Sequence, residues 1–162
     1  MLVIPLIVLP VPWYTTLLLF FIMHFISGLI LGTIFQTAHV VPTSAFPLPD
    51  KSGNVENDWA VHQLHTTNDF APKNSILTWL IGGLNYQVEH HLFPNISHIH
   101  YKHIAKIVQE TAKKHDLPYF VNKTFGQAVY QHFKMLKLLG KPQNPSLQFV
   151  ANNTGTNKSK AM

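Results

Sequence analysis

The residues in this sequence that are best suited to chemistry are its histidines. The chain carries 11 His among 162 residues, and imidazole is the commonest metal-binding side chain in proteins. The densest group is the pair His90-His91, with Gln87 one helical turn earlier. Residues three and four apart share one helix face, so Gln87 can point in roughly the same direction as the pair. Adjacent histidines diverge, so His90 and His91 can each serve a different ion of a two-metal centre.

Six further histidines lie on both sides of this pair: His39, His62, His65, His98, His100 and His103. Neutral imidazole binds iron, zinc or copper, whereas the amide oxygen of a glutamine is a harder and weaker ligand. We interpret His115 and His132 as polar surface residues. His24 lies inside an apolar stretch, where we expect it to pack against a neighbouring helix.

Composition narrows the class of protein. Charged residues make up only 12% of the chain, against about 25% in an ordinary soluble domain. Cysteine is absent, which excludes disulfides, thiolate metal sites and a cysteine nucleophile. The basic residues are all lysines and form no stripe, and arginine is the usual base-reading residue. The net charge of +5 therefore predicts contact with membrane lipid rather than with nucleic acid.

The first part of the chain is apolar enough to enter a membrane. No Asp, Glu, Lys or Arg occurs before Asp50. Residues 13–38 would form about 39 Å of helix at 1.5 Å per residue, against a hydrocarbon core of about 30 Å. We expect a transmembrane helix there, with Trp13 and Tyr14 as its interfacial anchors. Residues 1–9 are too short to span and are interpreted as the end of a preceding membrane helix, so that residues 1–40 form most of a helical hairpin.

The remainder has the composition of a soluble region. Its lysines place it on the cytoplasmic side of the membrane by the positive-inside rule. We expect a linker at 41–57, a helical region at 58–140 and a disordered tail at 141–162. Helical spacing and capping residues predict helices over 58–68, from Asn74 or Ser75 to 82, over 99–114 after a Ser97 cap, and over 125–139. Lys134 and Lys137 on the last of these suggest that it rests on the membrane surface. The fold class expected is all-α, a membrane hairpin followed by a cytosolic helical cap that carries the histidine pair.

One motif resembles that of a known family. The segment Gln87-Val88-Glu89-His90-His91-Leu92-Phe93-Pro94 is similar to the third histidine box of integral-membrane fatty acid desaturases, and its leading Gln resembles the front-end branch of that family. Residues 35–39, Phe-Gln-Thr-Ala-His, resemble the Gln-x-x-His at the end of the family's last membrane helix. Three further stretches resemble the family's lead-in to the box and the helix that follows it: Asp58-Trp59 with Gln63-Leu64 and Thr67, residues 83–86, and residues 104–115.

The resemblance implies a membrane enzyme with a non-haem centre of two iron ions. Such an enzyme uses O2 to introduce a cis double bond into a fatty acyl chain, with electrons from a small carrier such as cytochrome b5 or ferredoxin. By position, His39, His90 and His91 match iron ligands, and Gln87 matches a ligand or a hydrogen-bond donor to bound water. Four histidines match no ligand and are expected around the metal centre, where they would orient the ligands: His62, His65, His98 and His100.

Two histidine boxes that the family carries before its last membrane helices are not found in this sequence. We therefore expect the chain to be the C-terminal part of a longer desaturase and to be inactive by itself. Two other functions remain open from the sequence. One is a hydroxylase of the same superfamily. The other is a membrane-anchored, non-catalytic module that binds zinc through His98, His100 and His103, although two or three such ligands fall short of an ordinary structural zinc site.

Overall fold

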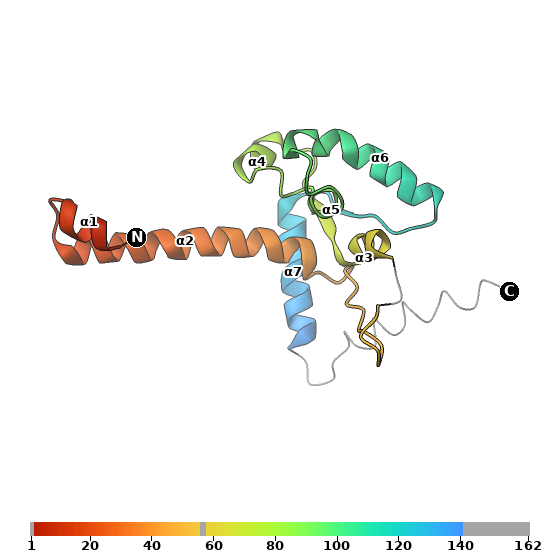
Figure 1. The fold of residues 1–162 in the computed structure, drawn as a ribbon, viewed down its shortest axis with the longest axis horizontal. Coiled ribbons are helices and arrows are strands. Elements are labelled where there is room, and N and C mark those ends of the chain that lie inside the picture. The colour runs from red at the N-terminus through yellow and green to blue at the C-terminus, as the bar shows by residue number, and fades with distance from the viewer. Residues whose placement is uncertain (1, 56–57, 141–162) are drawn as a thin grey trace. The chain divides into compact units, whose positions relative to one another are not determined.

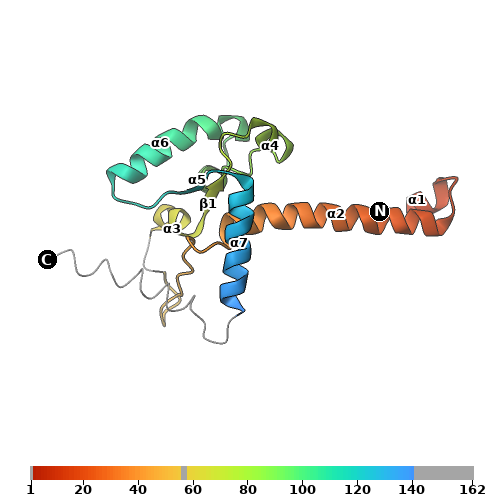
Figure 2. The same cartoon turned by 180° about the vertical axis from the view of Figure 1, so that it is seen from behind.

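A computed structural model describes residues 2–55 and 58–140; the expected tail at 141–162 lies outside the described residues. The chain divides into two compact units, Met1–Phe35 and Gln36–Met162. The ribbon and its reverse view show their elements (Figures 1 and 2).

The first unit is helical. It contains α1 (Val3–Val8) and most of α2 (Trp13–His39), and α2 reaches into the second unit. Among the described residues, α2 is the one helix long and apolar enough to cross a membrane, as the sequence predicted, and it extends one residue further. Its apolar side chains are exposed all round: the consecutive residues Leu29, Ile30 and Leu31 point about 100° apart around the helix, and all three are exposed. A helix that is apolar on every face requires an apolar surrounding.

His24 is satisfied within α2 itself. Its Nδ1 lies 2.9 Å from the Phe20 carbonyl oxygen one turn earlier, and its ring lies 4.0 Å from the Phe20 ring, centroid to centroid. The sequence predicts packing of this histidine against a neighbouring helix. The backbone carbonyl instead gives its polar nitrogen a partner, so His24 does not by itself call for a second helix.

The second unit packs short helices around the histidine box. Its elements are α3 (Trp59–Thr66), β1 (Asn68–Phe70), α4 (Ser75–Leu80), α5 (Gln87–Leu92), the 3-10 turn η1 (His98–His100), α6 (Tyr101–Lys114), β2 (Phe120–Asn122) and α7 (Phe125–Leu139). Its core joins α3, α5 and α6 through Leu64, Val88, Val108 and Ala112. The box helix α5 is thus packed against both α3 and α6.

The all-α expectation needs one correction. Strands β1 and β2 pair in parallel, with Asn68 opposite Phe120 and Phe70 opposite Asn122. The sequence analysis extended the first cytosolic helix through residue 68, but α3 ends at Thr66 and Thr67 is extended. A pair of three-residue strands leaves almost no periodic signal, and its partners come from distant parts of the chain.

Local capping explains the helices that were predicted well. The Asn74 side chain accepts a hydrogen bond from the Leu77 N–H and caps α4, which is the usual use of asparagine at this position. Thr124 caps α7 in the same way by accepting from the Gln127 N–H, while the Gln127 side chain accepts from the Lys123 N–H. This reciprocal pair resembles a capping box. The helix expected from residue 99 begins at Tyr101, after η1.

The segment expected as a linker is packed at its start. Val41 and Ser44 are buried, and the Ala45 N–H donates to the His65 carbonyl. The Asn68 side chain accepts from Thr43 and donates to Ser44. The residues directly after α2 are therefore fastened to α3 and β1, and this places His39 against the rest of the second unit.

Candidate metal centre

The histidine box lies on α5, and β1 supplies the group that caps this helix. The Val88 N–H, at the second position of α5, donates to Asp69 Oδ1 at 2.9 Å. The Val88 side chain is fully buried in the core. A carboxylate at a helix N-terminus also interacts favourably with the helix dipole. The position of α5 is therefore set by its cap and its core residue together.

Three histidines from two segments meet beside α5. The ring centroids of His39 and His91 lie 4.9 Å apart, and those of His90 and His91 lie 5.8 Å apart. We call His39, His90 and His91 the histidine cluster. Their meeting matches the convergence that the sequence predicts for these three residues, although they lie in distant segments.

Each imidazole of the histidine cluster has a partner at Nδ1. His91 Nδ1 donates to Gln63 Oε1 at 2.9 Å. His39 Nδ1 lies 3.3 Å from the Thr66 carbonyl oxygen. His90 Nδ1 lies 3.3 Å from the Tyr101 hydroxyl. The oxygen acceptors of His91 and His39 require the proton on Nδ1 and leave Nε2 available to a metal, which is the usual arrangement around metal-binding histidines. The Tyr101 hydroxyl fixes the orientation of the His90 ring.

The surroundings of His91 keep its ring neutral. Burial, followed by the proximity of His39 and His90, lowers the pKa of His91 to about 4. Neutral imidazole is the form that binds a metal. His91 therefore presents a neutral imidazole at physiological pH.

Gln87 adds an oxygen atom that lacks a protein partner. Its side chain is almost completely buried, with 1% exposed, and its Oε1 accepts no hydrogen bond from the described residues. A buried polar atom without a partner is costly. Gln87 lies on the same face of α5 as His90 and His91, because it precedes them by three and four residues. A metal ion or a metal-bound water on that face would satisfy it.

The histidine cluster does not by itself form a complete metal site. Within the described ranges, three His, Cys, Asp or Glu side chains nowhere come together so as to hold one ion. The donor chemistry still fits iron, because neutral imidazoles and an amide oxygen are ligands it accepts. The residues present therefore fit some, but not all, of the positions around two iron ions.

A buried acidic network that the sequence did not predict contacts α5 through Asp69 and Glu89. Tyr119 donates its hydroxyl proton to Asp69 Oδ2 at 2.6 Å and lies 3.0 Å from Glu89 Oε1. One hydroxyl has one proton, so the second contact requires a proton on Glu89. Burial and the neighbouring Asp69 raise the pKa of Glu89, and burial raises that of Asp69. The position of Glu89 inside the histidine box was the only feature of the sequence that could have pointed to this network.

The four histidines expected around the ligands make no described hydrogen bond to the histidine cluster. His62 Nδ1 is buried and has no hydrogen-bond partner among the described residues. Burial and the charge of His62 lower the pKa of His65. His98 and His100 are exposed. His98 packs on Gly83, and a Cβ added at Gly83 would lie 2.8 Å from the Cβ of His98. The Nδ1 partners of the histidine cluster are instead Gln63, Thr66 and Tyr101.

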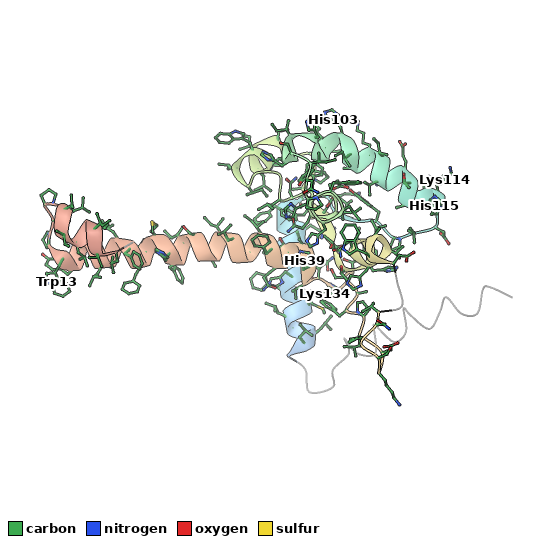
Figure 3. The ribbon with its side chains drawn as sticks, viewed as in Figure 1. Trp13, His39, His103, Lys114, His115 and Lys134 are labelled. Carbon is green, nitrogen blue, oxygen red and sulfur yellow. The ribbon has the colours of Figure 1, made fainter. Side chains whose placement is uncertain are left out.

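The remaining histidines lie away from the histidine cluster or serve packing. His103 and His115 are exposed near opposite ends of α6, apart from His39 (Figure 3). His132, expected on the surface, is half-buried and its Nδ1 donates to the Val40 carbonyl at 2.9 Å. This bond ties α7 to the residue that follows α2.

Comparison with known proteins assigns the family. The fatty acid desaturase family model matches residues 1–123. The chain is 42% identical over 129 residues to an acyl-lipid (8-3)-desaturase of Mortierella alpina, covering 80% of this chain and 29% of that protein. It is 41% identical over 115 residues to an sn-1 linoleoyl-lipid 6-desaturase of Synechocystis sp., covering 70% of this chain and 32% of that protein. A Delta(5) fatty acid desaturase A of Dictyostelium discoideum is 34% identical over 132 residues, covering 78% of this chain and 28% of that protein.

The chain belongs to the fatty acid desaturase family, as its histidine box suggested. It spans less than a third of the length of these curated relatives. No solved structure matches it.

Proposed function

We propose that this chain is the histidine-box region of a desaturase that introduces a cis double bond into a fatty acyl chain. The observation that carries the proposal is the meeting of His39 with His90 and His91, each with Nδ1 engaged and Nε2 left for a metal. When bound, two non-haem iron ions supply the activation of O2 and the removal of hydrogen from an unreactive methylene. Side-chain acids and bases cannot perform that removal.

The residues of this chain have separate tasks in the proposal. His39, His90 and His91 hold iron through Nε2, and Gln87 supplies its unpartnered oxygen to iron or to a bound water. Gln63 and Tyr101 orient the rings of His91 and His90. The remaining ligands come from outside the described residues, because three histidines are too few for two ions. Electrons come from a small carrier such as cytochrome b5 or ferredoxin.

In this proposal the protein lies in a membrane, with the histidine cluster on the cytoplasmic side. The family is associated with membranes, and α2 is long and apolar enough to span one. We place α1 and residues 13–38 in the bilayer as a helical hairpin, and the helical region from His39 onward on the cytoplasmic side as its cap. An acyl chain would then reach the metals from the membrane, and O2 and electrons would reach them from the cytosol.

The two other functions considered from the sequence receive less support. The relatives compared above are named desaturases, and none of those names is that of a hydroxylase. The histidines of the zinc hypothesis, His98, His100 and His103, are exposed and belong to no three-residue metal group within the described part of the chain.

A chimaeric enzyme tests the proposed function. This chain would replace the matching 129-residue part of the Mortierella alpina desaturase, and fatty acid products would be measured in cells. We expect the chimaera to form the double bond and to lose this activity on His90→Ala or His91→Ala. The exposed His115→Ala variant is the matched control and keeps it, and the 162-residue chain alone gives no product. An inactive chimaera, or a hydroxylated product, would contradict the proposal.

A further inference from the structure

The last helix, α7, presents an apolar stripe that no described residue covers. Tyr130, Phe133 and Leu136 are 66%, 63% and 45% exposed. They recur every three residues and therefore lie along one side of the helix. Lys134 and Lys137 are exposed beside them. We call these five residues the aromatic-basic face of α7.

The other side of α7 is fixed to the second unit. Ala128 and Met135 are buried, and Phe125 packs on Phe70 of β1 with ring centroids 5.7 Å apart. His132 donates to the carbonyl of Val40, the residue directly after α2. The helix therefore cannot turn its aromatic-basic face inward without losing these contacts.

We propose that the aromatic-basic face of α7 docks on the surface of a lipid bilayer with anionic headgroups. The docking rests on the proposal that α2 spans that bilayer. Tyr130, Phe133 and Leu136 would enter the boundary between headgroups and acyl chains. Lys134 and Lys137 would extend along the apolar surface and place their ammonium groups among lipid phosphates.

The position of Val40 along the membrane normal favours a bilayer as the partner of the aromatic-basic face. The 27 residues of α2 make a helix of about 40 Å, close to the ~40–45 Å of a bilayer with its headgroups included. Val40 therefore lies at headgroup level when α2 spans. Because His132 is bonded to Val40, α7 crosses that level, at the depth where interfacial amphipathic helices lie. A patch with aromatic, aliphatic and lysine side chains matches such helices in composition as well.

Fluorescence in vesicles tests the docking. The chain has no cysteine, so Phe133→Cys gives a single site for an environment-sensitive NBD fluorophore. The labelled full chain is reconstituted into phosphatidylcholine vesicles with and without phosphatidylserine, and nitroxide-labelled lipids serve as quenchers. We expect lipid quenching at position 133, stronger with phosphatidylserine. The same label at the exposed Gln109 of α6 should remain unquenched.

Two further variants, with one control, separate the insertion of α2 from the docking of α7. Met23→Cys, in the middle of α2, reports whether α2 is inserted, and we expect it to be quenched. Lys134→Gln with Lys137→Gln should lower the ratio of docked to undocked α7 roughly 30-fold on anionic vesicles, the factor for two lysines near such a surface. The matched pair Lys113→Gln with Lys114→Gln, at the end of α6, should leave it unchanged.

The outcomes decide between occupants. Quenching at position 23 without quenching at position 133 would overturn the docking and leave the spanning of α2 intact. A blue-shifted but unquenched label at position 133 would mean that protein, such as a second copy of the chain, covers the face. An unquenched label at position 23 would overturn the spanning of α2 and the docking that depends on it.

Discussion

The ring of His39, at the end of α2, lies 4.9 Å from the ring of His91 on α5, centroid to centroid. A linker, the helices α3 and α4 and the strand β1 separate the two residues in the sequence. The contact exists because Ala45 and Ser44 fasten the start of the linker to α3 and β1. The end of α2 is thereby joined to the histidine box.

The bond between Gln63 and His91 should control metal affinity. Gln63→Leu removes the acceptor of His91 Nδ1–H, so the ring loses its fixed orientation. We expect iron affinity of the active chimaera to fall about 10- to 100-fold, the usual cost of losing such a partner. Iron retained against increasing chelator concentrations measures the change. Gln109→Leu, at an exposed position of α6, is the control and should bind iron as before.

The Tyr119 hydroxyl should stabilise the second unit. Tyr119→Phe leaves Asp69 and Glu89 buried without the group between them. We expect the free energy of unfolding to fall by about 1–3 kcal/mol, the cost of an unsatisfied buried polar group. Thermal unfolding in detergent, followed by circular dichroism, measures it. Tyr130→Phe changes an exposed hydroxyl and should be neutral; equal stability of the two variants would contradict the role given to Tyr119.

Gly83 should not tolerate a side chain. Its φ of +76° is in the left-handed region, and an added Cβ would lie 2.8 Å from the Cβ of His98. Gly83→Ala should therefore destabilise the second unit by more than the ~1 kcal/mol that separates glycine from alanine in helices. Gly126 on α7 has open space around it, so Gly126→Ala should be neutral or slightly stabilising. Melting temperatures of the two variants in the same detergent compare them directly.

Truncation of Phe70 should strongly lower the free energy of unfolding of the second unit. It is fully buried on β1 and packs on Phe125 of α7. Phe70→Ala should cost about 3–5 kcal/mol, the usual range for a buried phenylalanine. Denaturant unfolding monitored by tryptophan fluorescence measures this loss. Ile107→Ala, at an exposed position of α6, should change stability by less than about 0.5 kcal/mol.

The chain should be inserted in membranes through α2. After expression it should resist alkaline extraction and be released by detergent, because the apolar surface of α2 is exposed on every side. In intact spheroplasts, protease added outside should leave the part from His39 onward uncut. A chain that stays soluble without detergent contradicts the insertion, and external digestion of the C-terminal part contradicts the cytoplasmic side.

Local sequence was sufficient for the elements whose stability is local. The charge-free stretch predicted α2 because its length and composition alone decide insertion. Asn74 predicted the start of α4, and helical spacing with Gly140 as a stop signal predicted α7. The parallel pair of β1 and β2 was not predictable in the same way, because it joins segments on either side of the box and each strand has three residues.

The identity of the histidine box was set by the sequence, and so was its assignment to a family. Only the tertiary structure decided what surrounds it. Gln63, Tyr101 and the Thr66 carbonyl orient the rings, whereas the sequence analysis looked for histidines in that role. The Tyr119 hydroxyl is hydrogen-bonded to Asp69 and Glu89, although the three residues come from the segment before β2, from β1 and from the box. A motif fixes residue types over a few turns, but hydrogen bonds between distant segments depend on how the whole chain packs, and no local pattern records that packing.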